Sequence, residues 1–222
     1  MTKAEILSHV DHTLLSVTAT EDDIKKTVTD AITYGCASVC IPPCFVKCAA
    51  EHARGRIRIC TVIGFPNGYA SAEVKCFEAR AAIADGADEL DTVIPVGCVK
   101  AGDYNALSRE ITMLREATAG RILKVIIETC LLTDAEKREC ARIVSESGTD
   151  YIKTSTGFSS GGATVADVRL LYESVTPPTR VKAAGGIKDF ADAEAMLAAG
   201  ADRLGTSRLV SILKSDEKEG NY

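Results

Sequence analysis

Short apolar runs rich in β-branched residues recur along the chain and alternate with segments that have helical periodicity. The apolar runs predict eight strands, at residues 9–15, 37–41, 57–63, 89–94, 123–127, 150–153, 180–184 and 203–205. Segments with helical spacing separate most of these runs and include residues 44–52, 71–85, 104–117, 134–147, 165–175 and 189–199. Strands that alternate with helices are typical of a parallel sheet with helical crossover connections.

The ends of three predicted helices are similar in sequence, which supports this alternation. Asp-Gly-Ala-Asp at 85–88, Ser-Gly-Thr-Asp at 147–150 and Ala-Gly-Ala-Asp at 199–202 each end a helix with glycine and lead directly into a strand. Eight strands in 222 residues fit a TIM (β/α)8 barrel. An open, doubly wound sheet is the alternative, and the sequence pattern distinguishes poorly between the two. We therefore predict a single (β/α)8 barrel domain over residues 1–222, with a flexible C-terminal tail from about residue 214.

The composition excludes several classes of protein. The chain is 46% hydrophobic and 26% charged, as globular proteins are, so it is neither disordered nor fibrous. Its formal net charge of -5 and the lack of a long basic run argue against a nucleic-acid partner. The apolar runs are too short to cross a bilayer and the first residues show no secretory signal, so we expect a cytoplasmic protein that is not bound to a membrane.

Nine cysteines lie at positions 36, 40, 44, 48, 60, 76, 98, 130 and 140, most of them within apolar stretches. Because the count is odd and no secretory signal is visible, we expect free thiols rather than disulfides. The four-residue spacing from Cys36 to Cys48 looks like a series of metal ligands, but Pro42 and Pro43 interrupt it and no C-x-x-C knuckle is present. We expect no metal, and the glycine motifs of dinucleotide and P-loop sites are absent as well.

Three neighbouring predicted strands each carry a lysine within an apolar run: Lys124, Lys153 and Lys182. Burial of an ammonium group is costly unless it is paired or neutralised, and barrels place reactive side chains at the C-terminal ends of their strands. If the three side chains converge, mutual repulsion should lower at least one ammonium pKa, and a neutral amine can form a Schiff base with a carbonyl. The alternative is that one or two of these lysines reach solvent or pair with acids.

Two acidic residues are candidate partners of these lysines. Asp91 lies inside the apolar run at 89–94, where it could exchange protons with Lys182 through a water or act as the counter-ion of the buried lysines. Asp11 precedes His-Thr-Leu-Leu and is a second candidate acid, whose alternative role is to orient backbone amides at the first strand.

Two short segments after the last two predicted strands are suited to binding a phosphate. The first contains Gly185 and Gly186, and the second is Gly205-Thr206-Ser207. Barrels commonly bind phosphate with the loops after these two strands, since glycine lets backbone N–H groups approach the anion and hydroxyls add donors. Arg208 either adds positive charge to this region or faces solvent.

These residues lie in motifs that resemble those of the deoxyribose-phosphate aldolase family. The matching segments are residues 11–15, 38–43, 61–68, 85–91, 123–129, 152–157, 181–187 and 203–207, in the family's order and over nearly the whole chain. Lys-Thr-Ser-Thr-Gly at 153–157 and Lys-Ala-Ala-Gly-Gly at 182–186 are the most specific pair.

The resemblance implies a class I aldolase in a TIM barrel, without cofactor or metal, that takes part in deoxyribonucleoside catabolism. Such an enzyme reversibly cleaves 2-deoxy-D-ribose 5-phosphate to D-glyceraldehyde 3-phosphate and acetaldehyde. The resemblance implies that Lys153 forms the Schiff base, Lys182 perturbs it and relays protons, and Asp91 is the acid/base partner. It implies supporting roles for Lys124, Asp11 and Thr156, and phosphate binding by Gly157, Gly185, Gly186, Gly205, Thr206 and Ser207. It also suggests a homodimer or a higher homo-oligomer.

The chain departs from the family pattern at two positions, and other functions stay open. Arg208 stands where a small residue is common, and Pro42 where a polar or aromatic residue is frequent. We hypothesise that Tyr222 folds over the site and assists proton transfer, the alternative being a disordered end. Three other functions are another Schiff-base aldolase for a phosphorylated sugar or keto-acid, a phosphate-binding barrel without chemistry, and a metal-dependent lyase.

Overall fold

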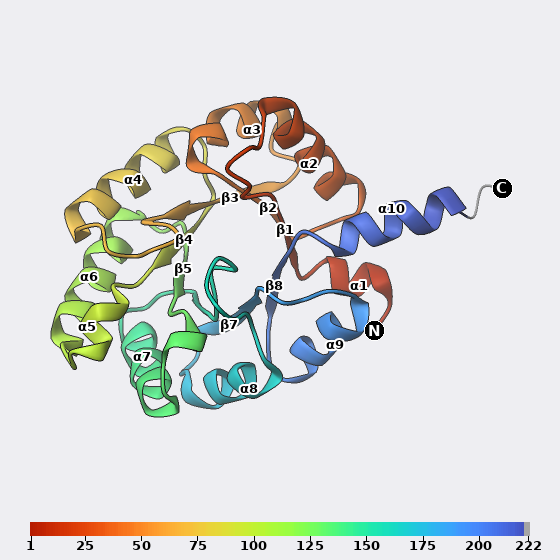
Figure 1. The fold of residues 1–222 in the computed structure, drawn as a ribbon. Coiled ribbons are helices and arrows are strands. Elements are labelled where there is room, and N and C mark those ends of the chain that lie inside the picture. Colours follow the sequence, from red (N-terminus) through yellow and green to blue (C-terminus); the bar gives the residue numbers. More distant parts are fainter. Residues whose placement is uncertain (220–222) are drawn as a thin grey trace.

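Eight parallel strands close into a barrel, and their order around the ring follows their order along the chain (Figure 1). The computed structural model describes residues 1–219. Its strands are β1 (Val10–Thr13), β2 (Ser38–Ile41), β3 (Arg58–Ile63), β4 (Glu89–Val93), β5 (Ile122–Ile126), β6 (Tyr151–Lys153), β7 (Arg180–Ala184) and β8 (Arg203–Thr206). Each strand begins and ends within two residues of the bounds predicted for it. The closed ring of eight strands confirms the TIM barrel and excludes the open sheet.

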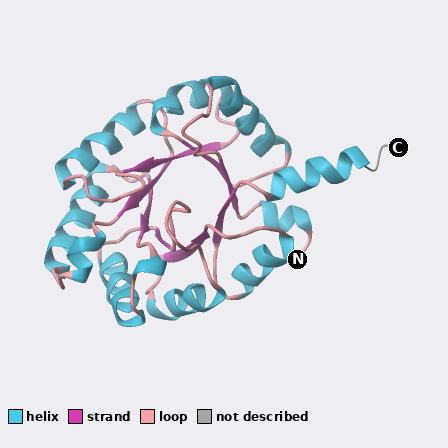
Figure 2. Cartoon of the chain, viewed as in Figure 1, coloured by secondary structure: helices cyan, strands magenta, loops and turns pink. Residues whose placement is uncertain are grey.

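Helices form an outer ring around the strands (Figure 2). They are α1 (Lys3–Leu7), α2 (Glu21–Thr33), α3 (Val46–Ala53), α4 (Ala72–Ala84), α5 (Val96–Lys100), α6 (Tyr104–Ala117), α7 (Asp134–Glu146), α8 (Val165–Ser174), α9 (Phe190–Ala198) and α10 (Leu209–Glu219), with short 3-10 turns η1 (Pro43–Phe45) and η2 (Thr129–Leu131). All six helices named from the sequence are present, and α1, α2, α5 and α10 are additional. No helix within residues 1–219 is both long and apolar enough to span a bilayer.

The polar segment expected to be a tail from about residue 214 is helical as far as Glu219. It forms the second half of α10, which extends outward from the barrel beside α1 (Figure 1). Its charged side chains pair with the neighbouring helices, since Lys214 Nζ lies 2.8 Å from Asp30 and Lys3 Nζ lies 2.9 Å from Asp216. These ion pairs attach the polar segment to the neighbouring helices, which its composition did not indicate. Tyr222 lies outside the described residues.

Alternation along the strands separates the apolar core from the functional site. In β4, Leu90 packs in the core between the barrel and the helices, whereas Glu89 and Asp91 on the opposite face reach charged side chains of other strands inside the barrel. The register places Asp91 beside Lys124 of β5, and the β6 lysine beside the β7 lysine. The interior of this barrel is therefore charged, where many TIM barrels are filled by branched apolar residues.

Gly68 couples the loop after β3 to the end of β4. Its φ is +74°, and its N–H donates to Gly64 O at 2.8 Å. A Cβ atom at this position would lie 2.1 Å from the carbonyl oxygen of Ile94, which is backbone and cannot rotate away. Gly68 thus meets two constraints, a left-handed conformation and a close backbone approach.

We predict that Gly68→Ala lowers the free energy of unfolding by about 2–3 kcal/mol, because alanine adds a steric overlap to the cost of a positive φ. The matched control is Gly55→Ala, where φ is +72° but no atom lies within 4 Å of the added Cβ. This control should lose only about 1 kcal/mol. Urea unfolding monitored by circular dichroism measures both variants, and equal losses would contradict the overlap.

Candidate active site

Three lysine ammonium groups surround one buried carboxylate inside the barrel. Lys153 Nζ and Lys182 Nζ each lie 2.7 Å from Asp91 Oδ2, and Lys124 Nζ lies 2.8 Å from Asp91 Oδ1. The lysines come from the consecutive strands β5, β6 and β7; the register pairs Lys153 with Lys182, whereas Lys124 pairs with Tyr151, two residues before Lys153. The structure therefore brings together the three lysines and the acid that the sequence singled out.

A second layer of charge lies on the side of this cluster that faces the N-terminal ends of the strands. Asp11 accepts hydrogen bonds from Lys182 Nζ and from Arg203 Nη1, the latter at 2.6 Å. Glu89 lies 2.6 Å from Lys124 Nζ and 3.2 Å from Arg203 Nη1. The sequence analysis missed Glu89 and Arg203. Glu89 could have been found from strand periodicity, because it precedes Asp91 by two positions and so shares its face.

The carboxylates of this cluster ionise more readily than isolated ones. Burial by itself raises the pKa of Asp91, but the three surrounding lysines outweigh it and hold that pKa well below its usual range. Burial also opposes ionisation of Asp11, and the nearby cations, Lys182 first among them, lower its pKa nevertheless. Both side chains are therefore charged at neutral pH.

The structure corrects the prediction made for the lysine pKa values. Mutual repulsion was expected to lower at least one of them. Burial does act to lower the pKa of Lys182, but Asp11 and Asp91 raise it above its ordinary value. Burial likewise opposes the charge of Lys124, yet carboxylates, Asp91 foremost, raise its pKa well above the ordinary value. For these two lysines the expectation is wrong, because the sequence showed where the cations lie but not how closely the anions approach them.

A cavity of about 450 Å³ opens above Lys153. Its walls come from the segments after β1, β6, β7 and β8, and they include every predicted phosphate-binding residue together with Thr156 and the cations Lys188 and Arg208. Of the three lysines, Lys153 is the one that lines this cavity. Both the amine and the predicted anion-binding groups therefore face the same space.

The loops after β6 and β7 pack backbone against backbone at the edge of this cavity. A Cβ on Gly185, whose φ is +77°, would lie 3.2 Å from Gly162 Cα and 3.4 Å from Gly157 Cα. Ala163 N–H donates to Gly185 O at 3.0 Å and ties the two loops together. Close packing of the two loops therefore requires glycine at position 185, independently of any role in binding an anion.

Glu128 is a further residue that the sequence analysis missed. It directly follows β5, is buried, and has a φ of +57°, which is uncommon for a residue with a Cβ. Its carboxylate accepts hydrogen bonds from Thr156 Oγ1 at 2.5 Å and from Thr156 N–H at 3.2 Å. Glu128 therefore fixes the loop that follows Lys153. Its position within the motif at 123–129 was the available signal.

Two groups of donor atoms have spacings that a metal ion could use, but cations already contact them. The donor atoms of Cys40, Cys60 and Asp91 lie within 4.8 Å of one another, as do those of Asp11, Cys60 and Glu89. Lys124 Nζ, however, lies 2.8 Å from Asp91 and 3.3 Å from Cys60 Sγ. We assign these carboxylates to the lysines and the arginine. All nine cysteines are free thiols.

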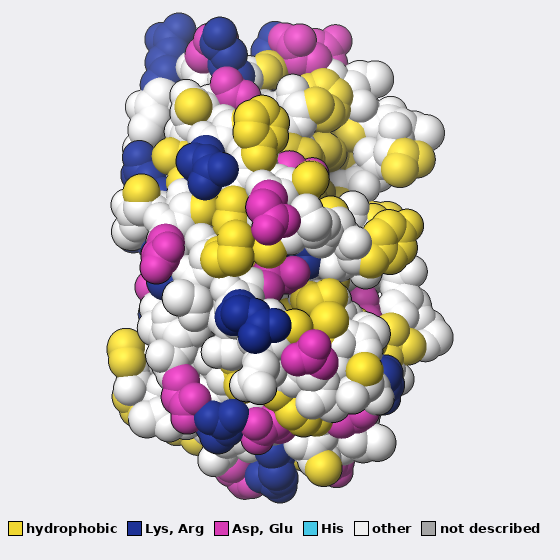
Figure 3. Space-filling view, turned by 90° about the vertical axis from the view of Figure 1, so that its left-hand side faces the viewer, with side chains coloured by type: hydrophobic (Ala, Val, Ile, Leu, Met, Phe, Trp, Pro, Cys, Tyr) yellow, Lys and Arg dark blue, Asp and Glu magenta, His cyan; other side chains and the backbone are white. Residues whose placement is uncertain are grey.

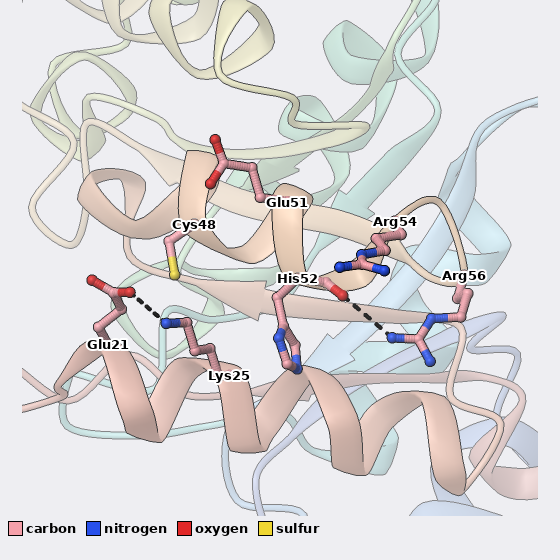
Figure 4. Close-up of a pocket in the computed structure, with 7 residues that line it drawn as sticks. All are labelled: Glu21, Lys25, Cys48, Glu51, His52, Arg54 and Arg56. Atoms are coloured by element: carbon pink, nitrogen blue, oxygen red, sulfur yellow. Dashed lines mark hydrogen bonds and ion pairs between the residues drawn. The ribbon is translucent and has the colours of Figure 1, made fainter.

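A second hollow lies on the outer helical layer, between α2 and α3 (Figure 4). It is lined by Glu21, Lys25, Cys48, Glu51, His52, Arg54 and Arg56. Its charges are of both signs, and Lys25 Nζ pairs with Glu21 at 2.6 Å. Because no strand residue lines it and barrels place their chemistry at the C-terminal ends of the strands, it is not a candidate active site.

Comparison with known proteins agrees with this geometry. The model of the DeoC/LacD family of aldolases matches residues 6–215. A deoxyribose-phosphate aldolase of Clostridium botulinum (strain Alaska E43 / Type E3) is 50% identical over 220 residues, which cover 99% of this chain and 100% of the relative. The chain belongs to the deoxyribose-phosphate aldolase family. The family resemblance inferred for this aldolase from its motifs is thereby confirmed.

Solved structures of related aldolases share the fold of this aldolase. One described as QR15, an aldolase, has a TM-score of 0.91 and 37% identity and covers 97% of each chain. The deoxyribose phosphate aldolase from Aeropyrum pernix, described as a unique tetrameric structure, has a TM-score of 0.88 and 33% identity. It covers 96% of this chain and 93% of the other.

We predict that Asp11→Asn destabilises the protein in a pH-dependent way. A carboxyl group with a lowered pKa in the folded state contributes stability that is full above the unfolded value of about 3.9 and is lost as the pH falls towards the folded value. The difference in unfolding free energy between the wild type and the variant should therefore be constant from about pH 5 to 8 and shrink below about pH 4. Urea unfolding at each pH measures it, and a constant difference down to about pH 3 would refute the charged role of Asp11.

Proposed function

We propose that this aldolase reversibly cleaves 2-deoxy-D-ribose 5-phosphate to D-glyceraldehyde 3-phosphate and acetaldehyde through a Schiff base on Lys153. The observation that carries the proposal is the placement of Lys153, which lines the same cavity as the glycine and hydroxyl groups suited to a phosphate. Lys124 and Lys182 are fully buried beneath it, so Lys153 is the amine that a substrate aldehyde can reach.

The reaction begins when the neutral amine of Lys153 adds to the aldehyde carbon of the substrate. With one added proton the carbonyl oxygen leaves as water, and a positively charged iminium forms. The C2–C3 bond then breaks as the 3-hydroxyl group loses its proton; the bonding electrons flow to the nitrogen, leaving a neutral enamine and releasing the aldehyde phosphate. Protonation of the enamine carbon and hydrolysis release acetaldehyde. Asp91 Oδ2 contacts both Lys153 and Lys182 at 2.7 Å, which gives protons a short route between the two amines.

The phosphate is bound at the opposite end of the same cavity in this proposal. Backbone N–H groups at Gly186 and in the segment Gly205-Thr206-Ser207 supply donors, and Lys188 and Arg208 supply positive charge. Binding energy obtained at this end holds the sugar so that its aldehyde faces the amine, which raises the rate of addition. The phosphate also explains why two cations, Lys188 and Arg208, line a cavity that already contains the Lys153 side chain.

Apolar side chains exposed on α4 and α6 support a homodimer or a higher homo-oligomer. Val74 and Phe77 on α4 are 50% and 68% exposed, and Met113 on α6 is 37% exposed. Helices α4 and α6 are on the left in Figure 1, the side that faces the viewer in Figure 3, where apolar groups lie among charges of both signs. A groove between α4 and α6 is lined by Met113 and by charged residues of both signs, Glu73, Arg80 and Glu116, and such mixed charges suit contact with a second copy. We propose that this face is the subunit interface.

The cytoplasm is the compartment proposed for this activity, and deoxyribonucleoside breakdown its metabolic context. Nine free thiols fit a reducing compartment. The substrate is a phosphorylated sugar, and charged phosphates are retained inside cells because they do not cross bilayers unaided. No nucleic-acid or membrane partner is proposed.

We predict that sodium borohydride, added with the substrate, converts Lys153 to a secondary amine that peptide mass spectrometry locates. Lys153→Leu should lose both the adduct and nearly all aldolase activity, because no other amine lines the reacting end of the cavity. Lys188→Leu is the matched control, since Lys188 lines the same cavity but makes no contact with Asp91, and it should still form the adduct on Lys153. Full activity in Lys153→Leu would exclude this mechanism. Release of pyruvate or a ketose phosphate, instead of acetaldehyde, would favour a different Schiff-base aldolase.

We predict that Phe77→Glu shifts the protein towards the monomer, because a charge placed on this face must be desolvated when two copies associate. Val17→Glu is the control, since Val17 is 97% exposed in the segment between β1 and α2, outside the proposed interface. Sedimentation velocity at several protein concentrations measures both. The same distribution of species in the wild type and in Phe77→Glu would remove α4 from the interface.

A further inference from the structure

The charges inside the barrel are unequal in number. Seven ionisable side chains, each at most 6% exposed, form one contiguous network of ion pairs. Four of them are cations: Lys124, Lys153, Lys182 and Arg203. Three are carboxylates: Asp11, Glu89 and Asp91. When every lysine is protonated, the network therefore holds one positive charge more than its carboxylates can match.

We propose that Arg203 supplies the permanent positive charge that makes this network release one lysine proton. A guanidinium group does not lose its proton in proteins, so the surplus can be relieved only at a lysine. Arg203 does not line the cavity; it acts through Asp11 and Glu89, which its Nη1 contacts at 2.6 and 3.2 Å. Arg203 is thus a positioning residue, and the proposal rests on the function proposed above.

The contacts of the lysines identify the one that gives up its proton. Lys124 Nζ lies within 4.0 Å of three carboxylates, at 2.6, 2.8 and 3.7 Å, and Lys182 contacts two. Among the described residues, the one carboxylate that Lys153 contacts is Asp91, which it shares with both of the others. Removal of a proton from Lys153 therefore breaks the fewest ion pairs. It leaves three cations with three carboxylates.

This balance also favours the later steps of the proposed reaction. The amine and the enamine carry no charge on the Lys153 nitrogen, so in these states the network is balanced. The ammonium and the iminium each carry one positive charge, which restores the surplus. The same excess charge thus favours the nucleophilic amine before addition and draws the bonding electrons onto the nitrogen when the iminium collapses to the enamine.

Other ionisable groups near the network contribute differently. Arg58 contacts Glu89 at 3.6 Å, but its side chain is 59% exposed and so largely screened by solvent. Burial raises the pKa of Tyr151 to about 12, and burial also raises that of Cys60, so both are uncharged. A hydrogen bond with Cys60 lowers the pKa of Cys40, which makes this thiol the remaining group that could supply a fourth negative charge.

Three charged groups at the cavity lie outside the network of ion pairs. Lys188 and Arg208 line the cavity and are exposed to solvent. Glu128 is buried near its edge, but both of its carboxylate oxygens accept hydrogen bonds from Thr156. None of the ion pairs within 4.0 Å among residues 1–217 joins Glu128 to the lysines or to Arg203.

The test is the pH dependence of kcat/KM for 2-deoxyribose 5-phosphate in two variants of opposite charge. Arg203→Met removes a positive charge, so the acid limb of the profile should move to higher pH by about one unit. Glu89→Gln removes a negative charge, so the limb should move to lower pH by about one unit. Loss of packing alone would lower the rate at every pH and would not move the two limbs in opposite directions.

Two further variants test the assignment of charge. Arg203→Lys keeps a positive charge, so its acid limb should stay within a few tenths of a pH unit of the wild type. Cys40→Ser should also leave the limb in place if the thiol is neutral. A shift to lower pH in Cys40→Ser, as large as that expected for Glu89→Gln, would show a fourth anion in the network and overturn the proposal.

Borohydride trapping on the same samples separates this proposal from the proposed function. If the wild type forms no adduct on Lys153, the Schiff-base function itself fails. If the adduct forms there but the limbs of Arg203→Met and Glu89→Gln stay fixed or move in the same direction, the function stands and the charge balance fails. Should Arg203→Met not fold by circular dichroism, the Glu89→Gln limb decides alone: a shift to lower pH supports the balance, and no shift or an upward shift refutes it.

Discussion

A single buried carboxylate, Asp91, holds the functional site together. Its two oxygens accept ion pairs from three lysines on three consecutive strands, at 2.7 to 2.8 Å. Without it, the lysines would face one another in a medium of low polarity, where removal of one partner from a buried ion pair typically costs several kcal/mol. Lys153 depends on Asp91 for its ion pair, whereas Lys182 also pairs with Asp11, and Lys124 with Asp11 and Glu89.

The barrel makes such a cluster tolerable because it separates packing from chemistry. Apolar residues on the outer face of each strand pack against the helices and provide the hydrophobic stability. The inner face is then free to carry charge, with Arg203 and Glu89 towards the N-terminal ends of the strands and Lys153 at the cavity. Buried ion pairs are weak sources of stability but strong constraints on geometry, so the cluster fixes where the amine points.

The loops at the cavity show how neighbouring strands cooperate. Glu128, after β5, fixes Thr156, which follows the lysine of β6, and the glycines of the β6 and β7 loops pack directly against each other. Residues that follow different strands thus position one another around the substrate space. These contacts hold in place even the loop between β6 and α8, which runs from residue 154 to residue 164.

The sequence by itself determined the order of the strands and their bounds to within two residues, because a short apolar run rich in β-branched residues is a local property of the chain. It also singled out Lys124, Lys153, Lys182 and Asp91, because a charged residue within an apolar run differs from its local context, but it left open whether their side chains converge. Only the tertiary structure decided the balance of charge. The lysine pKa values follow from distances to carboxylates on strands far apart in sequence, with Asp11 nearly the length of the chain away from its partner on β8. Those distances arise when the barrel closes, and no local pattern encodes them.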